Sequence, residues 1–405
     1  MRLHVGIMLL FIALIGTRPA DAGDVPVLRT ADHASSTQDI VDNMRPLPAG
    51  AQQSLEALFT AMTADGVPFS PGSGRALIEF VRRACLEDSG WKLASRQGAE
   101  GAAYMVKIEA PFQHFLSLNF TPGIPDYAVF PASLRYSTSL DSNALIRVYS
   151  LLGAGPAGGQ TCVSGRLGGT EEITPNPESG SYFSYTNSRT FNRFSLDGCD
   201  VLLSCAQMTS PSTLSNRGAP VGPLNKALYY YSEKPGLNLP GMTWISSQIT
   251  RSSTLSVYFS LGSNETAAAS FAWLNAGWKG MNVIRAHHIL HSQITTLDFS
   301  RRIAENPDVT AERMAAIVND ASHMSMAGLN TDYNRYLAYV RTCRDNAKPG
   351  FLCRSNILQD LYDSEKALTV PIPYRRALIV QEQVRSLLGI ATWSAEPNGK
   401  TVAMR

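Results

Sequence analysis

Two stretches early in the chain repeat their apolar side chains at helical spacing. Residues 52–64 and 75–87 place hydrophobic side chains three or four positions apart, and Gly66 follows the first stretch. Because an α-helix has 3.6 residues per turn, such positions share one face. The pattern therefore predicts two amphipathic helices, of which the first ends at the glycine.

From about residue 102 to residue 262 the pattern changes to short apolar runs separated by Gly, Pro, Asn and Ser. Short runs with turn residues between them are typical of antiparallel strands. Residues 174–189 and 210–223 contain so many turn residues that we expect long surface loops there. The predicted strands are 104–109, 133–139, 145–152, 190–196, 199–205, 227–232, 242–249 and 255–261.

Asp197-Gly198 separates two alternating runs and predicts a two-residue β-hairpin. In that register Leu196 faces Cys199, and Phe194 faces Val201. Apolar side chains of both strands then point to one side of the hairpin, because successive residues of a strand alternate between its two faces.

After residue 263 the pattern becomes helical again, and Thr310 is a candidate N-cap. The chain thus predicts an α+β fold, with an antiparallel β-rich N-terminal portion, an all-helical C-terminal portion and disulfides. We divide it into an α+β domain (49–262), a helical domain (263–392) and an unstructured tail (393–405), preceded by a linker (23–48). The expected helices are 265–276, 281–305, 311–326, 332–343, 356–367 and 374–388.

The N-terminus resembles a secretory signal peptide. Arg2 precedes an apolar run of about a dozen residues, and Ala20-Asp21-Ala22 has the small residues that signal peptidase reads. The run is shorter than the roughly 20 residues needed to cross a bilayer. We therefore predict cleavage before Gly23 and a soluble, periplasmic or secreted protein with no membrane span.

Composition excludes several classes of protein. The 405 residues are 44% hydrophobic and 17% charged, which supports a folded core and excludes a disordered chain. A net charge of +2 lacks the basic excess of a nucleic-acid binder. Nucleic acid is therefore not an expected partner.

Export would place the six cysteines in an oxidising compartment, where they can pair. Cys343 and Cys353 lie on either side of a predicted turn, so we expect a disulfide between them. Cys199 and Cys205 lie six residues apart on one strand, about 20 Å, which is too far for a mutual bond. We expect them to pair with the two remaining cysteines, Cys85 and Cys162, and the alternative is that all six are free thiols.

A glycine-rich motif, residues 153–159, has the form of a dinucleotide fingerprint. That motif needs a following helix to receive the pyrophosphate. Residues 160–170 contain more glycines and few helix formers, so we interpret the motif as a connection. We predict no organic cofactor.

Three histidines fall within five residues, at His287, His288 and His291. On a helix His287 and His291 are one turn apart and could bind one metal ion. An antiparallel neighbouring helix would add His323 and Asp320. Against this site, His323 lies away from the apolar face of its helix, and no glutamate follows His287. The alternative is that these histidines border an apolar stripe and bond to the backbone or to Asp298.

Other catalytic patterns are absent or ambiguous. No serine occupies a Gly-x-Ser-x-Gly elbow. Glu171, Glu172 and Glu178 accompany Tyr182, Phe183 and Tyr185, a set that could serve a sugar site or form a solvated loop. Tyr229 and Tyr231 would share one strand face and line a groove, or pack against the sheet.

The sequence leaves open whether the protein is an enzyme. We favour a non-catalytic binding or envelope-associated factor, because each catalytic pattern fails in its local context. A glycan, a peptide or an envelope component is the expected kind of partner. The alternative is an exported metal-assisted hydrolase that uses His287 and His291.

Overall fold

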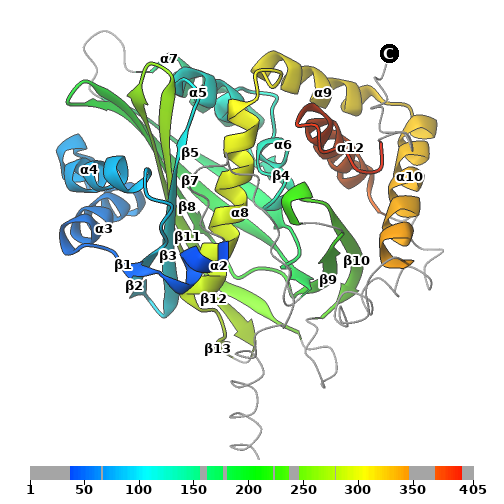
Figure 1. Cartoon of the computed structure of the whole chain (residues 1–405), viewed down its shortest axis with the longest axis horizontal. Helices are drawn as coiled ribbons and strands as arrows, with labels where there is room; N and C mark the ends of the chain where they lie inside the picture. The colour runs from blue at the N-terminus through cyan, green and yellow to red at the C-terminus, as the bar shows by residue number, and fades with distance from the viewer. Residues whose placement is uncertain are drawn as a thin grey trace, which may run out of the picture.

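The computed structural model describes residues 37–64, 67–155, 162–176, 180–221, 224–236, 246–278, 280–345 and 370–394. A large twisted sheet runs through these residues (Figure 1), and the two larger of their hydrophobic clusters lie on its opposite faces. The predicted signal peptide, the expected helix 356–367 and residues 156–159 of the glycine-rich motif lie outside the described residues. Among the described helices, none combines the length and apolar character needed to cross a membrane.

Ten strands of the described chain form the large sheet. All neighbouring strands are antiparallel except β1 and β2, which are parallel. Strand β13 (Met281–Asn282) pairs with β12 beside the main path. The order along that path is β1 (Arg45–Pro46), β2 (Trp91–Arg96), β3 (Ala99–Ile108), β12 (Glu265–Trp278), β11 (Gln248–Gly262), β8 (Cys199–Met208), β7 (Ser184–Leu196), β5 (Cys162–Ile173) and β4 (Leu134–Ser139).

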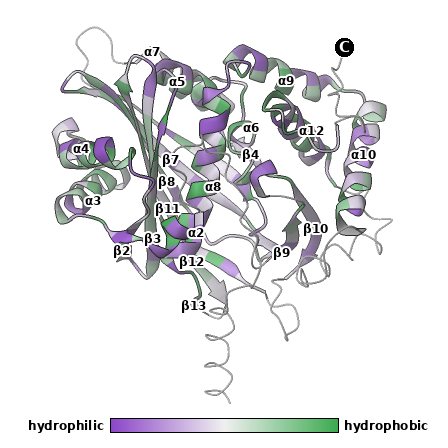
Figure 2. Ribbon diagram, in the orientation of Figure 1, coloured by the Kyte–Doolittle hydropathy of each residue, from purple (hydrophilic) through white to green (hydrophobic). Residues whose placement is uncertain are grey.

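Helices cover both faces of the sheet. On one face lie α3 (Ala49–Thr63) and α4 (Arg75–Ala84), which match the two helices that the sequence predicts. The short 3-10 helix Pro71–Gly74 lies between them and leads directly into α4. On the other face lie α5 (Phe112–Phe120), α7 (Ser142–Ala154) and α8 (Ala286–Glu305). Figure 2 shows hydrophobic and hydrophilic residues along the same helices, as expected when one side of each helix is buried.

A second group of elements lies beyond the β4 edge of the sheet. Helix α12 (Ile372–Leu387) packs against α9 (Ala311–His323), α10 (Met326–Asp345), the short helix α6 (Asp126–Val129) and β4 (Figure 1). A small sheet accompanies them, with the order β10 (Tyr229–Pro235), β9 (Asn216–Pro220) and β6 (Ser181–Tyr182). The remaining elements are α2 (Thr37–Asp42) and the 3-10 turn Leu224–Lys226.

The predicted helix at 265–276 is wrong, because these residues form β12. Ala267, Ala269 and Phe271 alternate toward one core while Ala268 faces the other, which is the period of a strand. The hairpin of β11 and β12 crosses the boundary that the sequence predicts between residues 262 and 263. Helix α8 lies close over the small side chains of this region, and Gln293 donates hydrogen bonds to backbone oxygens of both β3 and β12.

Two further expectations are also wrong. Residues 145–152, predicted as a strand, belong to α7, whose N-cap Asp141 accepts a 2.9 Å hydrogen bond from the Ala144 N–H. The predicted loop at 174–189 ends early, because β7 begins at Ser184. In both places tertiary contacts override local composition, because β7 pairs with β5 and α7 packs on the sheet.

The predicted hairpin at Asp197-Gly198 is confirmed. Leu196 pairs with Cys199 and Phe194 with Val201, and both turn residues have positive φ angles, 51° and 78°. A two-residue turn with positive φ at both positions has a twist that matches that of the flanking strands. The apolar side chains of both strands point into the core beneath α3 and α4, as expected.

The predicted disulfides are contradicted, because every described cysteine is a free thiol. Cys162 lies opposite Phe194, and Cys199 lies on the strand beyond β7, so two strand spacings of about 4.8 Å separate them. This exceeds the roughly 7 Å between α-carbons that a disulfide spans. Cys343 contacts Tyr339, and its expected partner Cys353 lies outside the described residues.

Free buried thiols predict slow alkylation. Burial raises the pKa of Cys85 to about 11 and that of Cys205 to about 12, and only the thiolate reacts. We expect iodoacetamide at pH 8 to label both at least about 100-fold more slowly in the folded chain than in denaturant. Peptide mass spectrometry with and without denaturant measures this. Fast labelling of Cys85 and Cys205 in the folded chain, or disulfide-linked peptides that contain them, would contradict the structure.

Candidate functional site

A hollow of about 90 Å³ opens where β4, β5 and β7 meet α6 and α7. This volume is that of roughly three water molecules in the liquid, at about 30 Å³ each. Its walls combine apolar, hydroxyl and charged side chains, and the charged ones come from three separate segments of the chain. They are Asp126 of α6, Glu171 of β5 and Arg189 of β7.

Arg189 joins the two carboxylates of the hollow. It donates from Nη1 to Asp126 Oδ2 at 2.8 Å and from Nη2 to Glu171 Oε1 at 2.9 Å. The side chains of Arg189, Asp126 and Glu171 are 21%, 16% and 11% exposed, respectively, so both ion pairs are largely shielded from water. Burial opposes the charge of Arg189, but Asp126 and Glu171 outweigh it and raise the pKa of the guanidinium.

The pairing of β5 with β7 places the remaining polar groups. Glu171 lies opposite Tyr185, and Asn187 and Arg189 follow at every second residue on the same strand face. Glu171 therefore also accepts from Tyr185 Oη at 2.7 Å and from Asn187 Nδ2 at 2.6 Å. Burial, and then the negative charge of Glu171, raise the pKa of the Tyr185 phenol.

Glycine keeps the floor of the hollow open. Gly169 lies opposite Asn187, and a β-carbon there would approach Asn187 Oδ1 to 3.0 Å and the Thr138 carbonyl oxygen to 3.2 Å. A larger side chain at this position would fill the space between the strands. The glycines after residue 167, which composition alone describes as loop-like, thus leave room for the hollow inside the sheet.

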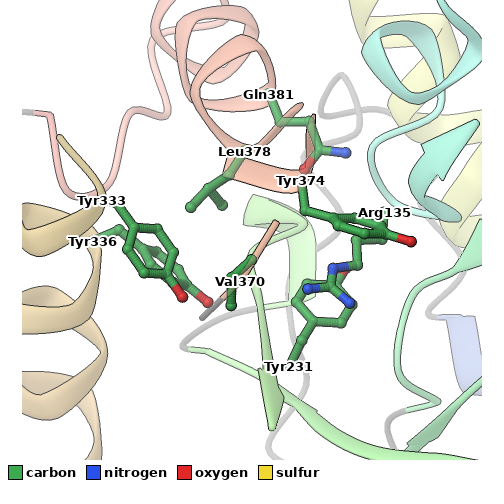
Figure 3. A pocket seen from close by; sticks show the side chains of 8 residues that line it. All are labelled: Arg135, Tyr231, Tyr333, Tyr336, Val370, Tyr374, Leu378 and Gln381. Carbon is green, nitrogen blue, oxygen red and sulfur yellow. The ribbon is translucent and has the colours of Figure 1, made fainter. Parts of the chain in front are cut away.

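A second, smaller cavity surrounds Arg135 of β4 (Figure 3). Its volume of about 20 Å³ holds about one water molecule. The guanidinium carbon of Arg135 lies 4.2 Å from the ring centres of both Tyr231 and Tyr374, and Tyr333 and Tyr336 of α10 line the cavity.

Two glutamates neutralise Arg135. Its Nη1 donates to Glu172 at 2.7 Å and its Nη2 donates to Glu233 at 2.7 Å, while its side chain is only 7% exposed. Burial raises the pKa of Glu172 despite the attraction of Arg135. Because the cavity is small and Arg135 already has two anionic partners, we interpret this cluster as structural.

Two of the carboxylates that were expected in a loop, Glu171 and Glu172, lie in a strand, and of these only Glu171 lines the hollow. Glu171 and Glu172 are adjacent in β5, so they point to opposite faces and serve the hollow and the Arg135 cluster respectively. Of their proposed companions, Tyr185 contacts Glu171, and Tyr182 lies near Arg135. Phe183 is buried in a small separate cluster, and Glu178 lies outside the described residues.

Tyr229 and Tyr231 were expected either to line a groove together or to pack against the sheet, and each alternative holds for one of them. Tyr231 lines the Arg135 cavity, whereas Tyr229 is buried and donates to the Ala132 carbonyl at 3.1 Å. Arg135, Asp126 and Arg189 stand in no sequence motif and were not predicted. Strand pairing brings Arg135 to Glu172 and Arg189 to Glu171, and α6 brings Asp126 to Arg189.

The histidines are not brought together with the other expected metal ligands. His287 and His291 lie one turn apart on α8, but α9 packs against α12 and α5 instead of forming the expected antiparallel pair with α8. His323 lies at the exposed end of α9 beside the Asn319 carbonyl at 2.9 Å, and Asp320 is exposed. Within the described ranges, no three His, Cys, Asp or Glu side chains form a group that could hold a metal ion.

Comparison with known proteins identifies no relative. The chain matches no family model and no curated protein. Among solved structures, the lipid transfer and protein localization domain of human StarD13 (DLC2) aligns with 56% of this chain and 98% of its own, at 9% identity and a TM-score of 0.23. A TM-score this low supports no inference about fold or function.

Proposed function

We propose that this chain is an exported, non-catalytic binding protein that holds a small polar ligand in the hollow between β4, β5, β7, α6 and α7. The observation that carries the proposal is the Arg189 cluster beside an open volume of about 90 Å³. Charged and hydrogen-bonding groups on a rigid sheet, next to apolar side chains, are typical of small-molecule sites. Export rests on the signal-peptide pattern of residues 1–22.

Binding fits the cluster better than catalysis does. A glycosidase of the usual kind needs one carboxyl group that can give a proton to the leaving group. Both oxygens of Glu171 already accept hydrogen bonds, and Arg189 donates to Glu171 and Asp126 alike. Such an arrangement fixes the two carboxylates as acceptors and favours recognition of a ligand.

Filling the hollow tests the proposal. Leu145 of α7 lines the hollow, so Leu145→Trp should occupy the space of the ligand. The probes are glucose, glucosamine, 1,4-diaminobutane and succinate, each tested for an increase in the melting temperature of the full chain. We expect at least one probe to raise it, and Leu145→Trp to abolish that increase, because only ligands of the folded state stabilise it.

The matched control lies on the same helix. Leu151 is 51% exposed and does not line the hollow, so Leu151→Trp should leave the response to every probe unchanged. If no probe stabilises the wild-type chain, or if Leu145→Trp responds as the wild type does, the hollow is not a binding site for ligands of these classes.

A further inference from the structure

The polar groups of the hollow leave more acceptors than donors for a ligand. A carboxylate offers about four lone-pair positions. Asp126 uses one for Arg189 at 2.8 Å and a second, weakly, for Tyr149 Oη at 3.5 Å. Asp126 can therefore accept further hydrogen bonds from a ligand.

The nitrogen donors on the walls are already directed at the carboxylates, whereas the serine and threonine hydroxyls of the lining can either donate or accept. The Asn187 amide and one side of the Arg189 guanidinium donate to Glu171, and the other side of the guanidinium donates to Asp126. A ligand that uses the open acceptor positions of Asp126 supplies N–H or O–H groups there.

The charge of the hollow favours a cation among such ligands. Its charged lining residues in the described chain are two carboxylates and one guanidinium, so their formal charges sum to −1. Because the three side chains are largely shielded from solvent, water only partly compensates this charge. A positively charged ligand group near Asp126 would complete the neutralisation.

Apolar side chains in the lining of the hollow determine which carbon skeleton a ligand can have. Ile124, Leu145 and Leu167 bring apolar side chains to the same hollow. They fit the carbon skeleton of a ligand and would exclude one that is charged throughout. With the volume of roughly three water molecules, the hollow accepts a compact carbon skeleton, and only part of a six-membered ring fits inside it.

We propose that the ligand of the hollow carries a primary ammonium group on a compact carbon skeleton, with the ammonium bound at Asp126 and the skeleton against the apolar wall. This inference rests on the proposed binding function and names its ligand class. An ammonium group has three N–H donors and one positive charge, which matches the open acceptor positions and the charge of the site.

Isothermal titration of the full chain compares three probes of similar ring size. Glucosamine and cyclohexylamine carry an ammonium group, whereas N-acetylglucosamine has the same sugar ring with its nitrogen uncharged. With the amines protonated, we expect each to bind at least about tenfold more tightly than N-acetylglucosamine. The affinity for the amines should also decrease as salt is raised.

The Asp126→Asn variant locates the charge that matters. It should lose at least about tenfold in affinity for cyclohexylamine and retain its affinity for N-acetylglucosamine. The control Glu265→Gln changes a half-exposed carboxylate that does not line the hollow, and it should bind both probes as the wild type does. The far-UV circular dichroism of Asp126→Asn shows whether it folds. If the variant does not fold, the comparison of probes and the salt dependence of the wild-type chain still test whether the ligand carries an ammonium group.

The outcomes separate this inference from the proposed function. Equal or tighter binding of N-acetylglucosamine that Leu145→Trp abolishes would overturn the ammonium class and leave the binding site standing. Amine binding that neither Asp126→Asn nor salt weakens would overturn the assignment of the cation to Asp126. Binding of no probe in either panel would overturn both proposals.

Discussion

Replacing Glu382 with alanine is expected to lower the free energy of unfolding by about 3 to 5 kcal/mol. Glu382 and Arg385 of α12 are 1% and 0% exposed, and Arg385 Nε donates to Glu382 at 2.8 Å. Removal of the carboxylate would leave the guanidinium as an uncompensated buried charge. Urea denaturation followed by circular dichroism gives the free energy directly.

Glu382 also holds the segment that follows α12. Its carboxylate accepts hydrogen bonds from the backbone N–H and the hydroxyl of both Thr392 and Ser394, at 2.7 to 3.0 Å. The predicted unstructured tail begins at residue 393, yet Trp393 is buried and Ser394 is bound to Glu382. The exposed helical residue Glu79 provides the control, and Glu79→Ala should change stability by no more than about 0.5 kcal/mol.

The effect of Glu382→Ala should depend on pH. Burial opposes ionisation of Glu382, but Arg385 and the hydrogen bonds from Ser394 and Thr392 outweigh it and lower the pKa below the ordinary value of 4.5. The folded chain thus keeps the carboxylate ionised at a pH where the unfolded chain has bound a proton. The stabilisation is complete above pH 4.5 and is lost as the pH falls through the folded pKa. A difference between wild type and variant that grows with acidification would contradict this assignment.

Arg135→Met is expected to lower the free energy of unfolding by a similar amount, about 3 to 5 kcal/mol near neutral pH. The substitution keeps an unbranched side chain between Tyr231 and Tyr374 but leaves the buried Glu172 without its cation. Glu233 is 46% exposed and can turn to solvent, so Glu172 should account for most of the loss.

Adding Glu172→Gln should restore part of the stability, because the amide removes the unpaired charge. We expect a coupling of about 0.5 to 3 kcal/mol in the double-mutant cycle, measured by urea denaturation. Burial already raises the pKa of Glu172 above 4.5, and loss of Arg135 would raise it further. A raised folded pKa means that stability is present at low pH and is lost as pH rises through that value, so the Arg135→Met defect should shrink toward pH 4.5. Independent, additive effects at every pH would show that the pair is not coupled.

The parts of the fold that the sequence predicted correctly depend on local patterns. The turn residues Asp197 and Gly198 specify their own hairpin, and the apolar stripes of α3 and α4 mark their buried faces. The alanine-rich run from residue 267 was misread because alanine has a high helix propensity. Here small side chains are needed in a central strand beneath α8.

The candidate site could not be predicted from such patterns. Arg135 meets Glu172 through strand pairing and Glu233 through the small sheet, whereas Asp126 meets Arg189 across 63 positions of the chain. No periodicity reports these contacts. The cysteine prediction failed for a related reason, because an oxidising compartment permits disulfides but only strand spacing decides which thiols can reach each other.

The position of β12 in the middle of the sheet has a consequence for how the chain folds. Glu100 of β3 pairs with Leu274 and Ile108 with Thr266, so β3 acquires this neighbour only after more than half of the chain has been made. Contacts so distant in sequence have a high loop-closure cost, and folding dominated by them is slow. A nascent chain that ends before residue 265 keeps one edge of β3 unpaired and its apolar residues exposed. Such an intermediate would be prone to aggregation and would depend on a chaperone or on rapid completion of the chain.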